Sequence, residues 1–108
     1  MKVIWSEQAL LDVEHIRDYI AQDSPPYAKP FVERLLQAAR HLRQFPQSGR
    51  LMPEANSPSI REVIYRGYRI IYRLRAHDVE VVMVVHGSRD LGGVEDRPWN
   101  AGPEKAND

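Results

Sequence analysis

Two spacings of apolar residues divide the chain into a helical first half and a β-rich second half. In the first half apolar residues recur every three or four positions, and the two stripes predict helices over residues 6–22 and 28–44. The stripes consist of Ala9, Val13, Ile16 and Ile20, and of Phe31, Leu35, Ala38 and Leu42. Ser6 is the expected N-cap of the first helix, and the break at 23–26 predicts an antiparallel hairpin. Because Pro30 lacks an N–H, we expect the second helix to begin late or to kink there.

From residue 60 onward the pattern changes to the alternation of β-strands. Three strands are predicted over 60–66, 68–75 and 79–86, with turns at Gly67 and at 76–78. The last strand is nearly all apolar, which favours a central place in the sheet. Residues 2–5 predict a further strand at the side of this antiparallel sheet, and the stretch after Arg50 is predicted as loop. The expected fold class is therefore α+β, with one domain over 1–91 and a loosely held tail over 92–108.

Composition narrows the function classes. The chain has 108 residues and no cysteine, so disulfides and Cys-ligated metal sites are excluded. No apolar run approaches the ~20 residues of a membrane span, and the first residues lack the features of a secretory signal. We expect a cytoplasmic protein of one domain. No Gly-rich phosphate loop, paired histidines at ligand spacing or Gly-x-Ser-x-Gly motif is present, so neither a metal nor a cofactor is expected.

The net charge of zero conceals an uneven distribution. Residues 29–75 hold ten cationic side chains, nine of them arginine, against three acids, a net charge of +7. Residues 1–28 carry −3 and residues 76–108 carry −4. A basic segment rich in arginine is typical of surfaces that bind nucleic acid or an acidic protein, but it also occurs on solvated helix faces and sheet rims.

Several of these arginines lie in or beside the predicted strands. Alternation places Arg69, Ile71, Arg73 and Arg75 on one face, and Tyr68, Ile70, Tyr72 and Leu74 on the face toward the helices. Arg61 and Arg66 flank the first of these strands, and Arg89 follows the last. Such guanidinium groups form either a binding surface or cross-strand ion pairs with Glu62, Glu80 and Asp90.

His86 is the candidate proton carrier. It ends the last strand, in phase with Val82 and Val84, and precedes Gly87-Ser88-Arg89. A histidine beside arginines is suited to general acid–base cleavage of a phosphodiester. No second proton-transfer group accompanies it, so a structural residue at a strand end is the competing interpretation.

Several short motifs resemble one family of small proteins. Phe45-Pro46 with Gly49-Arg50, Ile60-Arg61-Glu62, the run 67–73 (Gly-Tyr-Arg-Ile-Ile-Tyr-Arg) and the run 86–91 (His-Gly-Ser-Arg-Asp-Leu) resemble the RelE/ParE superfamily of type II toxins over residues 1–91. The resemblance implies a helical hairpin packed on an antiparallel sheet. It also implies a toxin held inactive by a cognate antitoxin protein.

The superfamily divides by target. Arg69 and Arg89 stand where RelE-like ribonucleases have functional arginines, but the lysine pair of those enzymes is replaced by the stretch that contains Glu62, and no tyrosine follows Arg89. The pattern is more similar to the ParE branch, whose studied members inhibit DNA gyrase without being nucleases.

Three hypotheses follow from this resemblance. The first is a gyrase inhibitor, rather than an enzyme, that uses Arg61, Arg69, Arg73 and Arg89 to bind its target or partner. The second is an mRNA endoribonuclease that uses Arg69, His86 and Arg89. The third is a non-toxic antitoxin-binding module.

Overall fold

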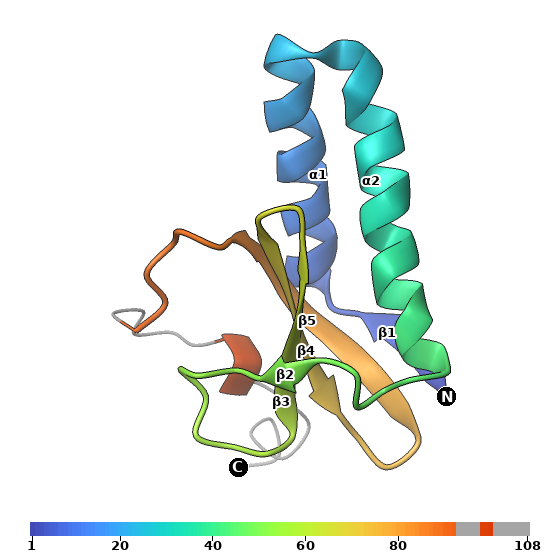
Figure 1. Cartoon of the computed structure of the whole chain (residues 1–108), viewed down its shortest axis with the longest axis vertical. Helices are drawn as coiled ribbons and strands as arrows, with labels where there is room; N and C mark the ends of the chain where they lie inside the picture. Colours follow the sequence, from blue (N-terminus) through green and yellow to red (C-terminus); the bar gives the residue numbers. More distant parts are fainter. Residues whose placement is uncertain (93–97, 101–108) are drawn as a thin grey trace.

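The computed structural model describes residues 1–92 and 98–100, and it confirms the predicted α+β fold. A strand is followed by a helical hairpin and then by four more strands (Figure 1). The elements are β1 (Lys2–Trp5), α1 (Glu7–Asp23), α2 (Pro25–Arg40), the 3₁₀ turn η1 (His41–Arg43), β2 (Arg50–Leu51), β3 (Ile60–Tyr65), β4 (Tyr68–Leu74), β5 (Asp78–His86) and the 3₁₀ turn η2 (Pro98–Asn100). None of the described helices is long and apolar enough to cross a membrane.

The hairpin follows the predicted stripes, with corrections at the second helix. The Ser6 hydroxyl accepts a hydrogen bond from the Ala9 N–H at 3.0 Å and caps α1 as expected. The expectation that α2 begins late is wrong, because it begins at Pro25 and contains Pro30. Pro25 at the first helical position loses nothing, since the first N–H groups of a helix have no partner within it. The helix also ends earlier than predicted, at Arg40, and continues as η1.

The sheet has the order β1-β5-β4-β3-β2. The antiparallel pairing of β3, β4 and β5 and the inner position of β5 are confirmed. β1 lies at the side of the sheet, where it pairs with β5 in parallel. The stretch predicted as loop contains the short edge strand β2, which pairs with β3.

Each face of the sheet carries a hydrophobic core. On one face the hairpin packs against Ile70, Tyr72, Val79, Val81 and Val84. The opposite face buries a second cluster of Met52, Ile60, Ile71, Val82, Met83, Val85, Leu91 and Trp99. The predicted face assignment of β4 is therefore confirmed, since Ile70 and Tyr72 face the helices while Ile71 does not.

A bulge in β5 corrects one prediction about His86. Ile71 pairs with Met83 but Tyr72 pairs with Val81, so Val82 is an extra residue. A bulge shifts the alternation of a strand by one residue. Val82 consequently packs in the second core while Val84 packs under the helices, and only Val84 is in phase with His86.

The predicted tail over 92–108 lies largely outside the described residues, and its loose order stays a prediction there. One described segment within it packs against the sheet. Pro98–Asn100 form η2, and Trp99 is 1% exposed in the second core. Figure 1 shows η2 beside the strands, on the side of the sheet away from the hairpin.

Candidate functional site

Arg69, one of the two arginines that match functional positions of the family, is buried in an ion-pair cluster. Its Nε donates to Glu62 at 2.7 Å, and its two terminal nitrogens donate to the two carboxylate oxygens of Glu54 at 2.9 and 2.6 Å. Arg50 donates to the second oxygen of Glu62 at 2.6 Å. The side chains of Arg69 and Glu62 are 7% and 0% exposed. All three nitrogens of the Arg69 guanidinium group thus engage the chain's own carboxylates.

The electrostatics of this cluster favour its charged form. The hydrogen bonds from Arg69 hold the pKa of Glu54 below its ordinary value of 4.5, against the opposing effect of burial. The same bonds, chiefly those to Glu54, raise the pKa of Arg69. Glu54 lies in the loop between β2 and β3, so the bidentate pair also fastens this loop to β4.

Arg61 and Arg73 also make contacts within the chain. Arg61 pairs with Tyr72 across the β3–β4 ladder and donates to the Gly49 carbonyl at 2.9 Å, on the helix side of the sheet. Arg73 is on the opposite face and donates to the Trp99 carbonyl at 2.6 Å. The four predicted binding arginines therefore do not form one surface, and three of them hold the loops and η2 in place.

The Phe-Pro-x-x-Gly-Arg motif has a structural role that sequence reasoning missed. The Tyr72 hydroxyl donates to the Pro46 carbonyl at 2.8 Å and accepts from the Gly49 N–H at 3.0 Å. A Cβ at residue 49 would stand 2.6 Å from the Tyr72 oxygen, so this close approach requires glycine. Arg50 completes the motif through its pair with Glu62.

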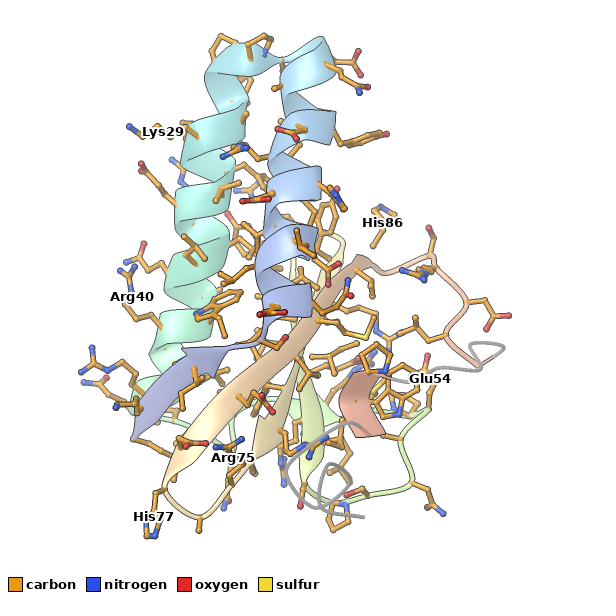
Figure 2. All side chains as sticks on the ribbon, turned by 180° about the vertical axis from the view of Figure 1, so that it is seen from behind. Lys29, Arg40, Glu54, Arg75, His77 and His86 are labelled. Carbon is orange, nitrogen blue, oxygen red and sulfur yellow. The ribbon has the colours of Figure 1, made fainter. Side chains whose placement is uncertain are left out.

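His86 lies on the other side of the sheet from Arg69. It pairs with Tyr68 across the β4–β5 ladder, and the two rings meet edge to face with centroids 5.3 Å apart. Its Nδ1 accepts from the Ser88 N–H at 3.2 Å and lies 2.7 Å from the Ser88 hydroxyl oxygen. Figure 2 shows His86 beside α1, well separated from Glu54, the partner of Arg69.

The environment of His86 is a shallow pocket of about 530 Å³ between α1 and the β4–β5 end of the sheet. It is lined by His15, Ile16, Tyr19, Tyr68, His86 and Ser88. Burial raises the pKa of Tyr68, whose ring also contacts Phe31. Apolar and aromatic surface dominates this lining, which suits a hydrophobic side chain of a partner.

Arg89 is the predicted arginine that stays exposed. Its main-chain N–H donates to the His86 carbonyl at 3.1 Å, and among the described residues no carboxylate pairs with its guanidinium group. The predicted nuclease set of Arg69, His86 and Arg89 is thus divided between a buried ion pair, a helix-side pocket and an exposed turn.

The competing ion-pair interpretation is confirmed for two of its three carboxylates. Glu62 pairs with Arg69, and Glu80 lies 3.7 Å from Arg75. Asp90 instead accepts the Gly92 N–H at 2.9 Å. Glu54 and Arg50 were missed, since they lie in or beside a stretch predicted as loop, where no period relates them to the strands. Among the described residues, no three histidine or acidic side chains come together as a candidate metal site.

Comparison with known proteins identifies the family. Residues 3–91 match the family model described as the ParE toxin of the type II toxin–antitoxin system parDE. The chain is 37% identical over 89 residues to Toxin RelE2 of Caulobacter vibrioides. This match covers 82% of this chain and 97% of that protein. It is 33% identical over 87 residues to the putative toxin Y4kP of Sinorhizobium fredii, covering 79% of this chain and 86% of that protein.

The fold agrees with a solved structure of the same class. A chain of the chromosomal ParDE system from P. aeruginosa superposes with a TM-score of 0.69 at 19% identity, over 80% of this chain and 95% of that one. At this identity the superposition supports the fold alone. The family match over residues 3–91 and the relative that is 37% identical show that this chain belongs to the ParE toxin family of type II toxin–antitoxin systems, within the RelE/ParE superfamily.

Proposed function

We propose that this toxin acts by binding and inhibiting DNA gyrase, not by cutting RNA, and that a cognate antitoxin protein neutralises it. The engagement of Arg69 carries the proposal. Both carboxylate oxygens of Glu54 occupy its terminal nitrogens, and Glu62 occupies its Nε. An arginine that is 7% exposed and whose three nitrogens all engage carboxylates is poorly placed to bind a phosphate group.

The position of His86 supports the same conclusion. A ribonuclease site needs a proton-transfer group and phosphate-binding cations around one phosphodiester. Here His86 and Arg69 lie on opposite faces of the sheet. His86 pairs with Tyr68, the residue before Arg69, and successive residues of a strand point to opposite faces. The toxin surface that we assign to gyrase binding instead includes the exposed Arg89.

The test is a supercoiling assay with purified gyrase, run beside a cleavage assay with RNA in the presence and absence of ribosomes. We expect the wild-type toxin to inhibit supercoiling and to leave RNA intact. Arg89→Ala should weaken inhibition at least tenfold, while His86→Ala should change it less than threefold. RNA cleavage that His86→Ala abolishes, with gyrase fully active, would establish the RelE-like alternative instead.

For the antitoxin, the pocket between α1 and the β4–β5 end offers an apolar groove beside the helical hairpin. An amphipathic helix of a partly disordered antitoxin, which orders on binding, fits such a groove. Co-expression with the protein encoded beside this gene checks this. We expect a complex that co-purifies and poor recovery of the toxin alone, whereas high yield in healthy cells and no co-purification would refute the partner.

A further inference from the structure

A second groove lies along the outer edge of β1, remote from the pocket at His86. It has a volume of about 650 Å³, and its lining comes from β1, α2 and η1. The lining residues are Met1, Lys2, Val3, Trp5, Leu36, Arg40 and Arg43. Figure 2 shows Arg40 projecting from α2 above β1. The lining thus combines apolar side chains with three cationic ones.

The main chain of β1 is open along this groove. β1 is one edge of the five-stranded sheet, and within the described residues β5 is its one partner strand. The Ser6 N–H donates to the Val81 carbonyl at 3.0 Å, so the main chain of Ser6 faces β5. Because the direction of main-chain groups alternates along a strand, the N–H and C=O groups of Val3 and Trp5 face outward. Such an edge is a template for one more strand.

The charges specify what kind of segment fits. Lys2, Arg40 and Arg43 line the groove, and no acidic side chain of the part of the chain that the structure describes does so. Among the described residues, no carboxylate forms an ion pair with any of the three. Arg40 lies in the last turn of α2, where a cation also stabilises the helix dipole. Stabilisation of the helix dipole accounts for Arg40, but it does not explain Lys2 and Arg43.

We propose that this groove binds an extended, acidic segment of the antitoxin, which adds as a strand to the outer edge of β1. Main-chain bonds to Val3 and Trp5 fix its register, and its carboxylates meet Arg40 and Arg43. The inference rests on the proposed antitoxin partner and adds a second contact to the helix in the pocket at His86. An extended peptide is preferred over a nucleic acid because only a peptide uses the open main chain.

The first test is charge reversal with a matched control on the same helix. Arg40→Glu with Arg43→Glu is compared with Lys29→Glu with Arg34→Glu, whose residues are exposed and outside the groove. The probe is the purified protein encoded beside this gene, titrated by calorimetry at 50 mM and 300 mM salt. We expect the groove variant to bind at least tenfold more weakly at low salt and the control less than threefold. If both variants lost affinity for that protein equally, the proposal that the groove binds it would be wrong.

A second measurement reports on the main chain directly. Amide hydrogen exchange at Val3 and Trp5 should be fast in the free toxin and at least a hundredfold slower in the complex. If the groove variant does not fold, Arg40→Gln with Arg43→Gln replaces it, and the exchange result still decides. Unchanged exchange in a tight wild-type complex refutes the strand addition while the antitoxin assignment stands. If the wild-type toxin forms no complex with the neighbouring protein, both the strand addition and the antitoxin assignment are refuted. Both are also refuted if the groove binds a 20-base single-stranded RNA instead of that protein.

Discussion

At the scale of single residues, the arginines in the central strands of this toxin are structural side chains. Arg69 fastens the loop between β2 and β3 through Glu54, and Arg61 and Arg73 donate to main-chain carbonyls. Removing a partner from a buried ion pair leaves an uncompensated charge at a cost of about 3–5 kcal/mol. Loss of toxicity in Arg69→Ala would therefore arise from lost folding, so such a variant identifies a target contact only if its stability is measured as well.

The pair of Glu54 and Arg69 gives a pH-dependent prediction. Because the pKa of Glu54 is lowered in the folded protein, the pair stabilises the fold fully above about pH 4.5, and this stabilisation is lost as the pH falls through the lowered pKa. Glu54→Gln should reduce the free energy of unfolding by about 1–3 kcal/mol at pH 7, and by less near pH 3. Urea unfolding at the two pH values measures this. Glu33→Gln, at an exposed position, is the control, and a penalty for Glu54→Gln that does not change with pH would contradict the prediction.

At the scale of elements, α2 shows how a helix tolerates a local defect. Pro30 lies inside the helix, so one main-chain bond to the Pro26 carbonyl is missing. The helix still forms, because Leu35 and Ala39 on its inner face are fully buried against the sheet. Tertiary packing here outweighs local propensity.

The defect in α2 is open to a stabilising substitution. Pro30→Ala restores the missing bond at an exposed position, and we expect it to raise the free energy of unfolding by about 1–3 kcal/mol. Thermal and urea unfolding measure the change. Pro26→Ala is the matched control, because a residue in the first turn has no bond to regain, and its effect should be below about 0.5 kcal/mol. A destabilised Pro30→Ala variant would show that the proline fits a bend that packing requires.

At the scale of the whole molecule, the described residues form two hydrophobic cores, and Trp99 packs η2 into the second. The Trp99 side chain is among the largest fully buried ones. The main-chain carbonyl of Trp99 accepts the hydrogen bond from the Arg73 side chain. The sheet face that carries Arg69 and Arg73 is thereby covered by the protein itself near η2.

The second core predicts a large effect of a distant residue on stability. Trp99→Ala should cost about 3–5 kcal/mol, as expected for a large buried aromatic side chain, and it should reduce the midpoint of urea unfolding accordingly. Tyr27→Ala, at a ring that is 71% exposed, should change stability by less than about 0.5 kcal/mol. If the two variants unfold alike, Trp99 does not belong to the cooperative core.

The sequence by itself determined the elements of this protein and the faces they bury. The period of apolar residues specifies which side of α1, α2 and β4 is inside, because removing apolar area from water is the main driving force of folding. The short motifs likewise determined the family over residues 3–91. Local signals were weaker at the ends of α2, where Pro25 and η1 shifted the boundaries.

Only the tertiary structure decided what the polar residues do. The bulge at Val82, the pairing of Glu54 with Arg69 and the burial of Trp99 all join segments distant in sequence, and no period relates such segments. An arginine in a strand has the same sequence signature whether its guanidinium group faces a carboxylate or a ligand. The difference depends on which acceptors the fold brings within about 3 Å of it, a consequence of long-range packing that a one-dimensional pattern does not contain.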